Sequence, residues 1–169
     1  YLAFMQCDEV TSIIIPSSVT TIGRCAFEYC EKLAEITLAD PDALIDISYE
    51  VFEGSYWYNK QPDGFVILGN NLVAYKGEIA GTKLVIPDGI KTIAQMITDD
   101  PSMENVTEIV LPEGLKGIAD SAFMYARLLK SINIPDSVVY IGEGAFRSNS
   151  LDEASKDRIR QINPEAIWS

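Results

Sequence analysis

A segment of about 23 residues recurs along the chain, and this recurrence constrains the fold more than any other feature. Its pattern is V/L-x-x-I-x-I/L-P-x-x-V/L-x-x-I-G/A-x-x-A-F, and the most regular copies are residues 10–27, 106–123 and 129–146. A repeat of this length predicts a solenoid, in which each unit buries its apolar face only against its neighbours. We therefore expect an extended surface to matter more for function than a single pocket.

Each copy begins with a short apolar alternation that predicts a strand. In residues 13–15 and 132–134 the first and third side chains should point into the core. A proline such as Pro16 or Pro135 follows and ends the strand, because proline cannot donate to a ladder. A second extended piece then leads through glycine into a helical turn that carries an Ala-Phe pair. We expect the phenylalanines of these pairs to stack in the core: Phe4, Phe27, Phe52, Phe123 and Phe146.

The copies are not uniform. The second needs two extra residues near Asp40 to Asp42 before Leu44 and Ile47 come into register, and the third has Thr98 where phenylalanine is expected. The first seven residues, YLAFMQC, align with RCAFEYC at positions 24–30, so they predict a partial coil. About six coils are expected in one domain, residues 1–169. This start within a repeat favours an N-terminally truncated fragment.

Residues 56–81 do not follow the period and predict an insert. Two apolar runs, residues 65–68 and 72–75, flank Gly69-Asn70-Asn71, which indicates a β-hairpin because Gly and Asn tolerate positive φ. Trp57, with a tyrosine on each side, precedes it. This aromatic cluster either packs the hairpin against the solenoid or forms an exposed binding knob. Packing is favoured, because a two-stranded hairpin needs support.

Residues 150–168 predict a C-terminal cap. Ser150-Leu151-Asp152-Glu153 has the form of a capping box, and Pro164 should end the helix. One helical face is expected to carry the apolar side chains Leu151, Ala154, Ile159 and Ile162. Together with Ile167 and Trp168, this helix should cover the last coil, since a solenoid needs a polar outer surface at its end.

Charge and residue chemistry exclude several classes of function. Thirteen basic residues against 25 acidic residues give a net charge of −12, which argues against nucleic acid and anionic lipid as partners. The chain has no histidine, no C-x-x-C and no phosphate-binding glycine loop, so we expect neither catalysis nor a cofactor. The loop acids Asp40, Asp42 and Asp46 do not match the spacing of a calcium loop, and no metal is expected.

Two of the three cysteines, Cys7 and Cys30, occupy the same repeat position and should stack on adjacent coils. Neighbouring strands lie about 4.8 Å apart. This spacing is compatible with a disulfide. A column of small, reduced thiols is the favoured alternative, because the later copies place Ser55, Ala126 and Asn149 there.

Residues 13–33, IIIPSSVTTIGRCAFEYCEKL, resemble the BspA-like leucine-rich repeat family of bacterial surface and secreted proteins. The insert WYNKQPDG and the closing LDEASKDRIRQINPEAIW are also similar to features of that family. The resemblance implies a strand-rich α/β leucine-rich-repeat solenoid, an extracellular or cell-surface location, and a role in adhesion or protein binding. It brings no catalytic motif with it. Several copies lack the small residue after the isoleucine or the cysteine, which makes those coils less regular.

The outward residues of the first strands are the candidate binding site. One row is expected to contain Ser12, Glu35, Lys83, Glu108 and Ser131, and the neighbouring row Ile14, Thr37, Val85, Val110 and Asn133. Contiguous exposed aliphatic side chains can mark a partner site, although β-branched residues also simply suit strands. We expect a non-catalytic module that binds protein or glycan. The alternatives are a structural spacer in a larger surface protein and, less favoured, a fragment of a glycan-acting enzyme.

Overall fold

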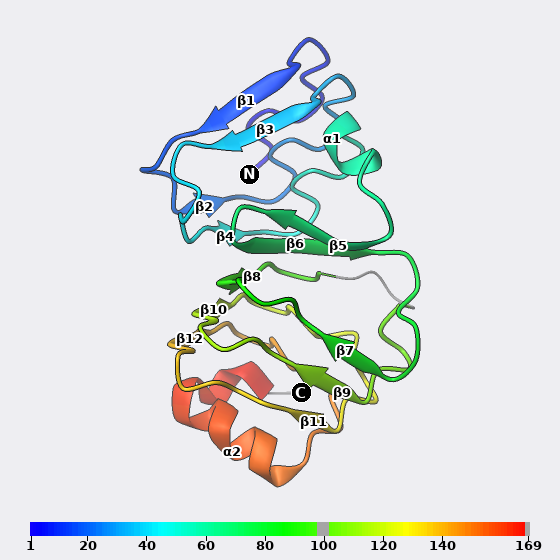
Figure 1. Ribbon diagram of the computed structural model, residues 1–169, viewed down its shortest axis with the longest axis vertical. Coiled ribbons are helices and arrows are strands. Elements are labelled where there is room, and N and C mark those ends of the chain that lie inside the picture. Colours follow the sequence, from blue (N-terminus) through cyan, green and yellow to red (C-terminus); the bar gives the residue numbers. More distant parts are fainter. Residues whose placement is uncertain (98–101, 168–169) are drawn as a thin grey trace.

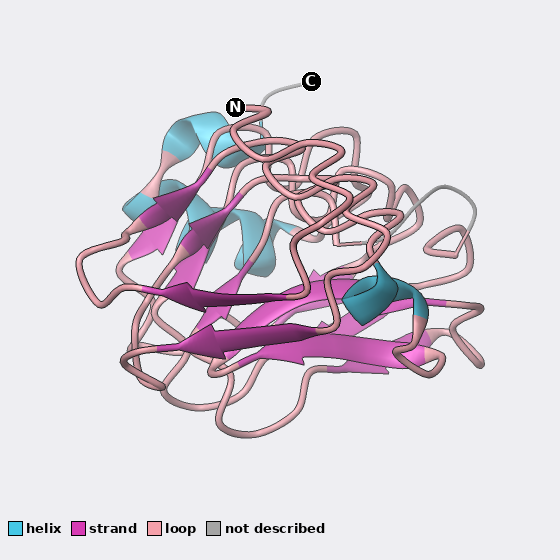
Figure 2. Ribbon diagram, turned by 90° about the horizontal axis from the view of Figure 1, so that it is seen from above, coloured by secondary structure: helices cyan, strands magenta, loops and turns pink. Residues whose placement is uncertain are grey.

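The computed structural model describes residues 1–97 and 102–167, and they form a solenoid of turns of about 23 residues (Figure 1). The first strands of the turns are β1 (Ser12–Ile15), β3 (Glu35–Leu38), β7 (Lys83–Val85), β9 (Glu108–Val110) and β11 (Ser131–Ile132). The second strands are β2 (Thr21–Ile22), β4 (Asp46–Ile47), β8 (Thr92–Ile93), β10 (Gly117–Ile118) and β12 (Tyr140–Ile141). Viewed along the stack, the strands gather on two sides of the coil and turns complete the circuit (Figure 2).

Within each sheet, equivalent strands of successive turns pair in parallel and in register. Ile13 faces Ile36, and Ser131 faces Glu108. Ile15 is buried whereas Ile14, between the two inward residues, is 71% exposed. The predicted alternation of the first strand is confirmed.

The Ala-Phe segments are successive tight turns. In the first copy, Ala26 N donates to Gly23 O and Glu28 N to Cys25 O, both three residues back. The amide of Phe27, which lies between these two residues, donates instead to Val51 O of the next coil, at 2.8 Å. Cys25 and Tyr29 adopt left-handed conformations, with φ of 56° and 55°. The predicted helical turn is therefore wrong in detail, because amides that a helix would use internally join adjacent coils.

The phenylalanine column is confirmed in two parts. Ring centroids lie 5.2 Å apart for Phe4 and Phe27 and 5.7 Å apart for Phe27 and Phe52, in stacked geometry. Phe123 and Phe146 stack at 5.5 Å in the second part. Thr98, which was predicted to interrupt the column, lies outside the described residues.

The first seven residues form the predicted partial coil. Their backbone amides donate to the aligned segment of the next coil, from Leu2 to Arg24 O at 3.0 Å and from Phe4 to Ala26 O at 2.8 Å. Cys30 Sγ donates to Phe4 O at 3.0 Å, and all three cysteines are free thiols. The alignment of the two segments is therefore confirmed.

The insert contains α1 (Tyr56–Asn59) and a hairpin of β5 (Gly64–Leu68) and β6 (Asn71–Lys76), as predicted. Trp57 is buried against Phe52, with ring centroids 5.1 Å apart, and its amide donates to Leu33 O. Packing is thus the role of this tryptophan. The hairpin is part of the solenoid, since β6 pairs in parallel with β8 in a sheet of order β12-β10-β8-β6-β5.

The second copy departs from its predicted register. Leu44 is 48% exposed whereas Ile45 is 1% exposed, so the prediction that Leu44 occupies the core position is wrong. The physical reason lies in the insert: the carboxamide oxygen of Asn71, from β6, accepts the amide of Ile45 at 3.0 Å. This contact holds the chain with Ile45 inward.

The C-terminal cap consists of α2 (Glu153–Ile162) and a 3-10 helix, η1 (Pro164–Ile167). The N-cap is Asp152, whose carboxylate accepts from Ser155 N at 2.8 Å, so the capping box starting at Ser150 is wrong. Ala154 is exposed and Ser155 is buried in its place, where its hydroxyl accepts from Ile132 N.

The cap also ends the ladder of turns. The amides of Gly144 and Phe146 donate to Glu165 O and Ala166 O of η1. Trp168, predicted to take part in the cap, lies outside the described residues. No helix in residues 1–97 or 102–167 has the length and apolarity to cross a membrane.

Candidate binding surfaces

The predicted outward row is divided into two groups. β1 pairs with β3, and β7, β9 and β11 form a separate sheet. The chain between β3 and β7 contains α1 and the hairpin, which lie between the two groups in the stack (Figure 1). The prediction of one continuous row is therefore wrong, because the insert takes the place of a first strand.

The first group, here called the β1–β3 face, consists of Ser12, Ile14, Glu35 and Thr37. Ser12 faces Glu35 and Ile14 faces Thr37 across the ladder. All four side chains are exposed. The face thus presents one large aliphatic side chain in a polar surround.

The second group, here called the β7–β11 face, contains Lys83, Val85, Glu108, Val110, Ser131 and Asn133. The Lys83 ammonium and the Glu108 carboxylate form an ion pair at 2.7 Å, and both are about half exposed. Val85 is 52% exposed and lies opposite Val110. These side chains form a small aliphatic patch beside a charged pair.

Asn133 has a structural task in this group. Its carboxamide accepts from Leu111 N at 2.7 Å and donates to Leu111 O at 3.0 Å, although it lies just beyond the end of β11. The Asn133 side chain thus pairs with the Leu111 backbone beyond the point where the backbone pairing of β11 ends.

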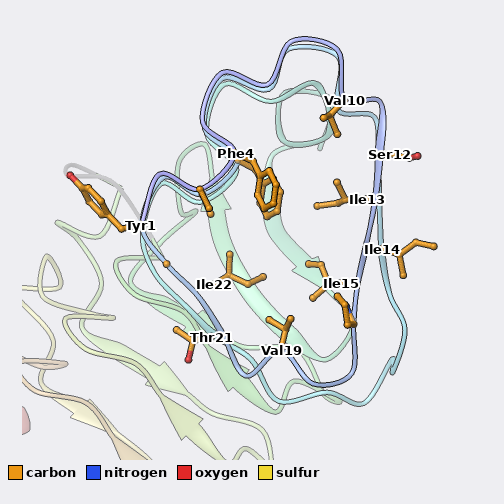
Figure 3. A pocket seen from close by; sticks show the side chains of 15 residues that line it. Tyr1, Phe4, Val10, Ser12, Ile13, Ile14, Ile15, Val19, Thr21 and Ile22 are labelled. Atoms are coloured by element: carbon orange, nitrogen blue, oxygen red, sulfur yellow. The ribbon is translucent and has the colours of Figure 1, made fainter.

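A cavity of about 610 Å³ lies at the open N-terminal end of the solenoid. Figure 3 shows Phe4, Ile13, Ile15 and Ile22 pointing into it, whereas Ser12 and Ile14 point away. Its lining is the core layer of the first coil. The cavity is an end face of the apolar core, and it lacks the convergent polar groups that fix a small ligand in a pocket.

A second hollow, of about 310 Å³, lies on the outer side of the second strands. On each second strand the residue before the inward isoleucine occupies the outward position: Thr21, Asp46, Thr92, Gly117 and Tyr140. Four of these, Asp46, Thr92, Gly117 and Tyr140, line the hollow. Small residues in β8 and β10 leave a trough between Asp46 and Tyr140. Sequence reasoning missed this site. The signal was available in the aligned copies, where this one position changes from threonine to glycine and tyrosine.

The acids proposed as poor calcium ligands have local structural partners. Asp40 Oδ1 accepts from Asp42 N at 3.0 Å, and Asp42 Oδ1 accepts from Asn70 Nδ2 at 2.7 Å. These bonds hold the expanded loop of the second copy against the hairpin. Asp46 lies away from them, at the trough.

A different group, Cys25, Glu28 and Glu50, places three ligand-type atoms within 4.8 Å of one another. The Glu50 carboxylate is already engaged by the Arg24 guanidinium at 3.2 Å. Burial is the main cause that raises the pKa of the Cys25 thiol to about 11. The Arg24–Glu50 ion pair joins two adjacent turns at this group.

Comparison with known sequences identifies one family. The chain matches the BspA type leucine rich repeat region in six copies, over residues 1–95 and 68–168. No curated protein matches the chain.

Three solved structures are similar. The T. pallidum leucine rich repeat protein TpLRR is 27% identical with a TM-score of 0.48, and the match covers 99% of this chain and 78% of that one. The pneumococcal vaccine antigen PcpA is 19% identical with a TM-score of 0.48, over 85% of this chain and 50% of that one. A leucine-rich repeat protein from Bacteroides ovatus is 27% identical with a TM-score of 0.37, over 90% of this chain and 44% of that one.

Proposed function

The chain belongs to the BspA type leucine-rich repeat family, and from this premise we propose that it is a non-catalytic module that binds a protein through its first strands. Repeats of this family are generally protein-interaction modules of bacterial surface proteins. A solenoid suits this role because its stacked turns present an extended surface. The proposed setting is a bacterial cell surface or secreted protein, in which the module serves adhesion.

One observation carries the proposal: large aliphatic side chains stand outward on the first strands at Ile14 and Val85, which are 71% and 52% exposed. Exposed aliphatic side chains that lie next to one another on a surface can mark a partner site, as Val85 and Val110 do. In both faces the aliphatic side chain is flanked by charged or hydroxyl groups, such as Glu35 or the Lys83–Glu108 pair. An apolar centre with a polar rim is the usual composition of a protein interface.

The alternatives make different predictions for these two residues. A structural spacer needs only the core positions, so its outward residues can change without effect. A glycan partner would be favoured by aromatic side chains, whereas the outward residues of both faces are aliphatic, hydroxyl or charged. A fragment of a glycan-acting enzyme needs two carboxylates about 5–10 Å apart in a cleft. The binding module with a protein partner is the candidate that the exposed aliphatic residues favour.

Capture of biotinylated surface proteins tests the proposal. The immobilised chain is exposed to surface proteins from host epithelial cells and, separately, from bacteria, and retained proteins are quantified by mass spectrometry. We expect at least one protein to be retained by the wild type and reduced about tenfold by Ile14→Lys or Val85→Lys, since a buried charge at an interface is costly.

Leu128→Lys is the matched control, because Leu128 is also aliphatic and 49% exposed but lies in the turn before β11. It should retain the same proteins as the wild type. If no retained protein distinguishes the two face variants from Leu128→Lys, the first strands do not bind a protein and the spacer becomes the better account.

A further inference from the structure

The trough on the second strands has a defined shape that follows from register. Thr92 of β8 pairs with Gly117 of β10, which in turn pairs with Tyr140 of β12. Gly117 presents no side chain where the neighbouring strand has a tyrosine. The hollow of about 310 Å³ therefore lies over Gly117, with the Tyr140 ring on one side and Asp46 on the other. It can hold one long side chain.

The floor of the trough is open because residue 117 is a glycine. The backbone at Gly117 is not strained. Gly117 does not adopt a positive φ, and a Cβ built there would meet only Tyr140 Cδ1, at an ordinary 3.8 Å. Threonine occupies the same position in the first and third copies. A side chain at Gly117 is thus compatible with the fold, and the hollow exists because none is present.

The rim carries negative charge without a cation to balance it. Asp120 Oδ1 accepts from Tyr140 Oη at 3.2 Å and from Glu143 N at 2.9 Å, which fixes its carboxylate beside the ring. Within residues 1–97 and 102–167, no hydrogen bond or ion pair reaches the Asp46 carboxylate. Burial, followed by repulsion from Asp120, raises the pKa of Asp46. Both causes mark a place where a positive charge would be stabilising.

Lys116 also lines the trough, but it does not neutralise these acids. No ion pair within 4.0 Å joins its ammonium to a carboxylate among the described residues. The two remaining walls are aliphatic, with Leu44 and Val139 exposed by 48% and 75%. An occupant must therefore combine a cationic end with an apolar stem.

We propose that this trough binds a lysine or arginine side chain of a protein partner. The stem packs against Leu44 and Val139, and the cationic head lies beside Asp46, within the field of Asp120. The Tyr140 ring adds attraction for the cation through its π face. The net charge of −12 steers a basic segment toward the molecule. The site lies on the second strands, which belong to different sheets from the first strands (Figure 1), so it is separate from the first-strand faces.

Amide chemical shifts of the full chain test the site with a matched pair of probes. N-acetyl-arginine amide carries the guanidinium, and N-acetyl-citrulline amide replaces it with a neutral group of the same shape. We expect the arginine probe to shift the amides of Thr92, Gly117 and Tyr140 with saturation in the millimolar range. The citrulline probe should bind at least about fivefold more weakly, and added salt should weaken only the arginine probe.

Two variants separate the charge from the cavity. Gly117→Thr fills the hollow with the side chain found in other copies and should abolish the shifts while the fold, checked by the rest of the spectrum, is retained. Asp46→Asn should weaken arginine binding about fivefold. Asp88→Asn is the control, because it removes the same charge from an exposed aspartate outside the trough.

Three results would overturn the proposal. Equal binding of both probes would show that charge plays no part. Binding that survives Gly117→Thr would place the probe elsewhere. Saturable shifts with neutral N-acetylglucosamine at the same amides, without a response to the arginine probe, would assign the trough to a glycan instead.

Discussion

The carboxamide oxygen of Asn71 accepts a hydrogen bond from the hydroxyl of Thr92 at 2.6 Å, and this contact joins the hairpin to the second-strand sheet. The same oxygen accepts from Ile45 N, and the Asn71 amide donates to Ala43 O and Leu68 O. Asn71 is fully buried, so every polar atom of its side chain is paired inside the protein. One side chain thus joins three segments of the chain.

Replacing Asn71 should destabilise the protein strongly. Asn71→Ala leaves buried partners, including Ile45 N, without a hydrogen bond, and we expect a loss of at least about 2 kcal/mol in the free energy of unfolding. Urea denaturation followed by circular dichroism measures it. The adjacent Asn70→Ala removes only an exposed bond to Asp42 and should cost less than about 1 kcal/mol. Similar costs for the two variants would contradict the role of Asn71.

The repeat pattern was sufficient to predict the inward residues of regular coils, because burial at Ile15, Ile22 and Phe27 depends only on period and pleat. The place of the hairpin could not be predicted in this way. Asn71 looked like a turn residue, since Asn favours positive φ, and its buried role depends on Ile45 and Thr92, which are 26 and 21 positions away. The wrong prediction for Leu44 has the same origin.

The candidate sites show a similar division. The exposure of outward residues on the first strands, such as Ile14, follows from the alternation of inward and outward side chains along a strand. Their separation into two faces depends on how the insert packs, which the period does not encode. The trough required a comparison of one outward position across all copies, and the glycine at position 117 gains meaning only beside Tyr140.

The stacked rings should differ in their contribution to stability according to burial. Phe123 is almost fully buried and stacks on Phe146, so Phe123→Ala should cost about 3–5 kcal/mol. Phe4 stacks on Phe27 but is about half exposed at the open end, and Phe4→Ala should cost less than half as much. Chemical denaturation of both variants provides the comparison. An equal or larger cost at Phe4 would mean that the open end is more tightly packed than its exposure indicates.

Alkaline pH should weaken the fold through Cys25. Its pKa is raised from 9.0 to about 11, mainly by burial, so the folded state retains the thiol proton more tightly than the unfolded chain. This contribution to stability is fully present below pH 9 and is lost as pH rises from 9 to about 11. Cys25→Ala removes the titrating group, and its free energy of unfolding should fall less steeply over this range. Parallel pH profiles for the two proteins would refute the assignment.

The start of α2 gives a prediction with the opposite pH sign. The Asp152 carboxylate accepts a hydrogen bond from the Ser155 amide, and this bond is the main cause that lowers the pKa of Asp152 below its ordinary 3.8. The ionised carboxylate therefore stabilises the fold above pH 3.8, and this stabilisation is lost as pH falls through the folded-state pKa. Asp152→Ala should lower the melting temperature at pH 7, and the difference from wild type should shrink progressively as the pH falls below 3.8.

Ser150→Ala separates the observed cap from the one that the sequence pattern predicted. Ser150 Oγ donates to Arg127 O on an exposed loop and does not cap the helix. Its replacement should change the melting temperature less than Asp152→Ala does, with no dependence on acid pH. A larger effect at Ser150 would restore the predicted capping box.

The break between β3 and β7 has an evolutionary consequence. Because the two groups of first strands belong to different sheets, a substitution that shifts the outward residues of β1 and β3 has no ladder through which to alter β7, β9 or β11. Selection can therefore change one face while it preserves the other. A new outward side chain at position 14 would thus leave the surface around Val85 unchanged.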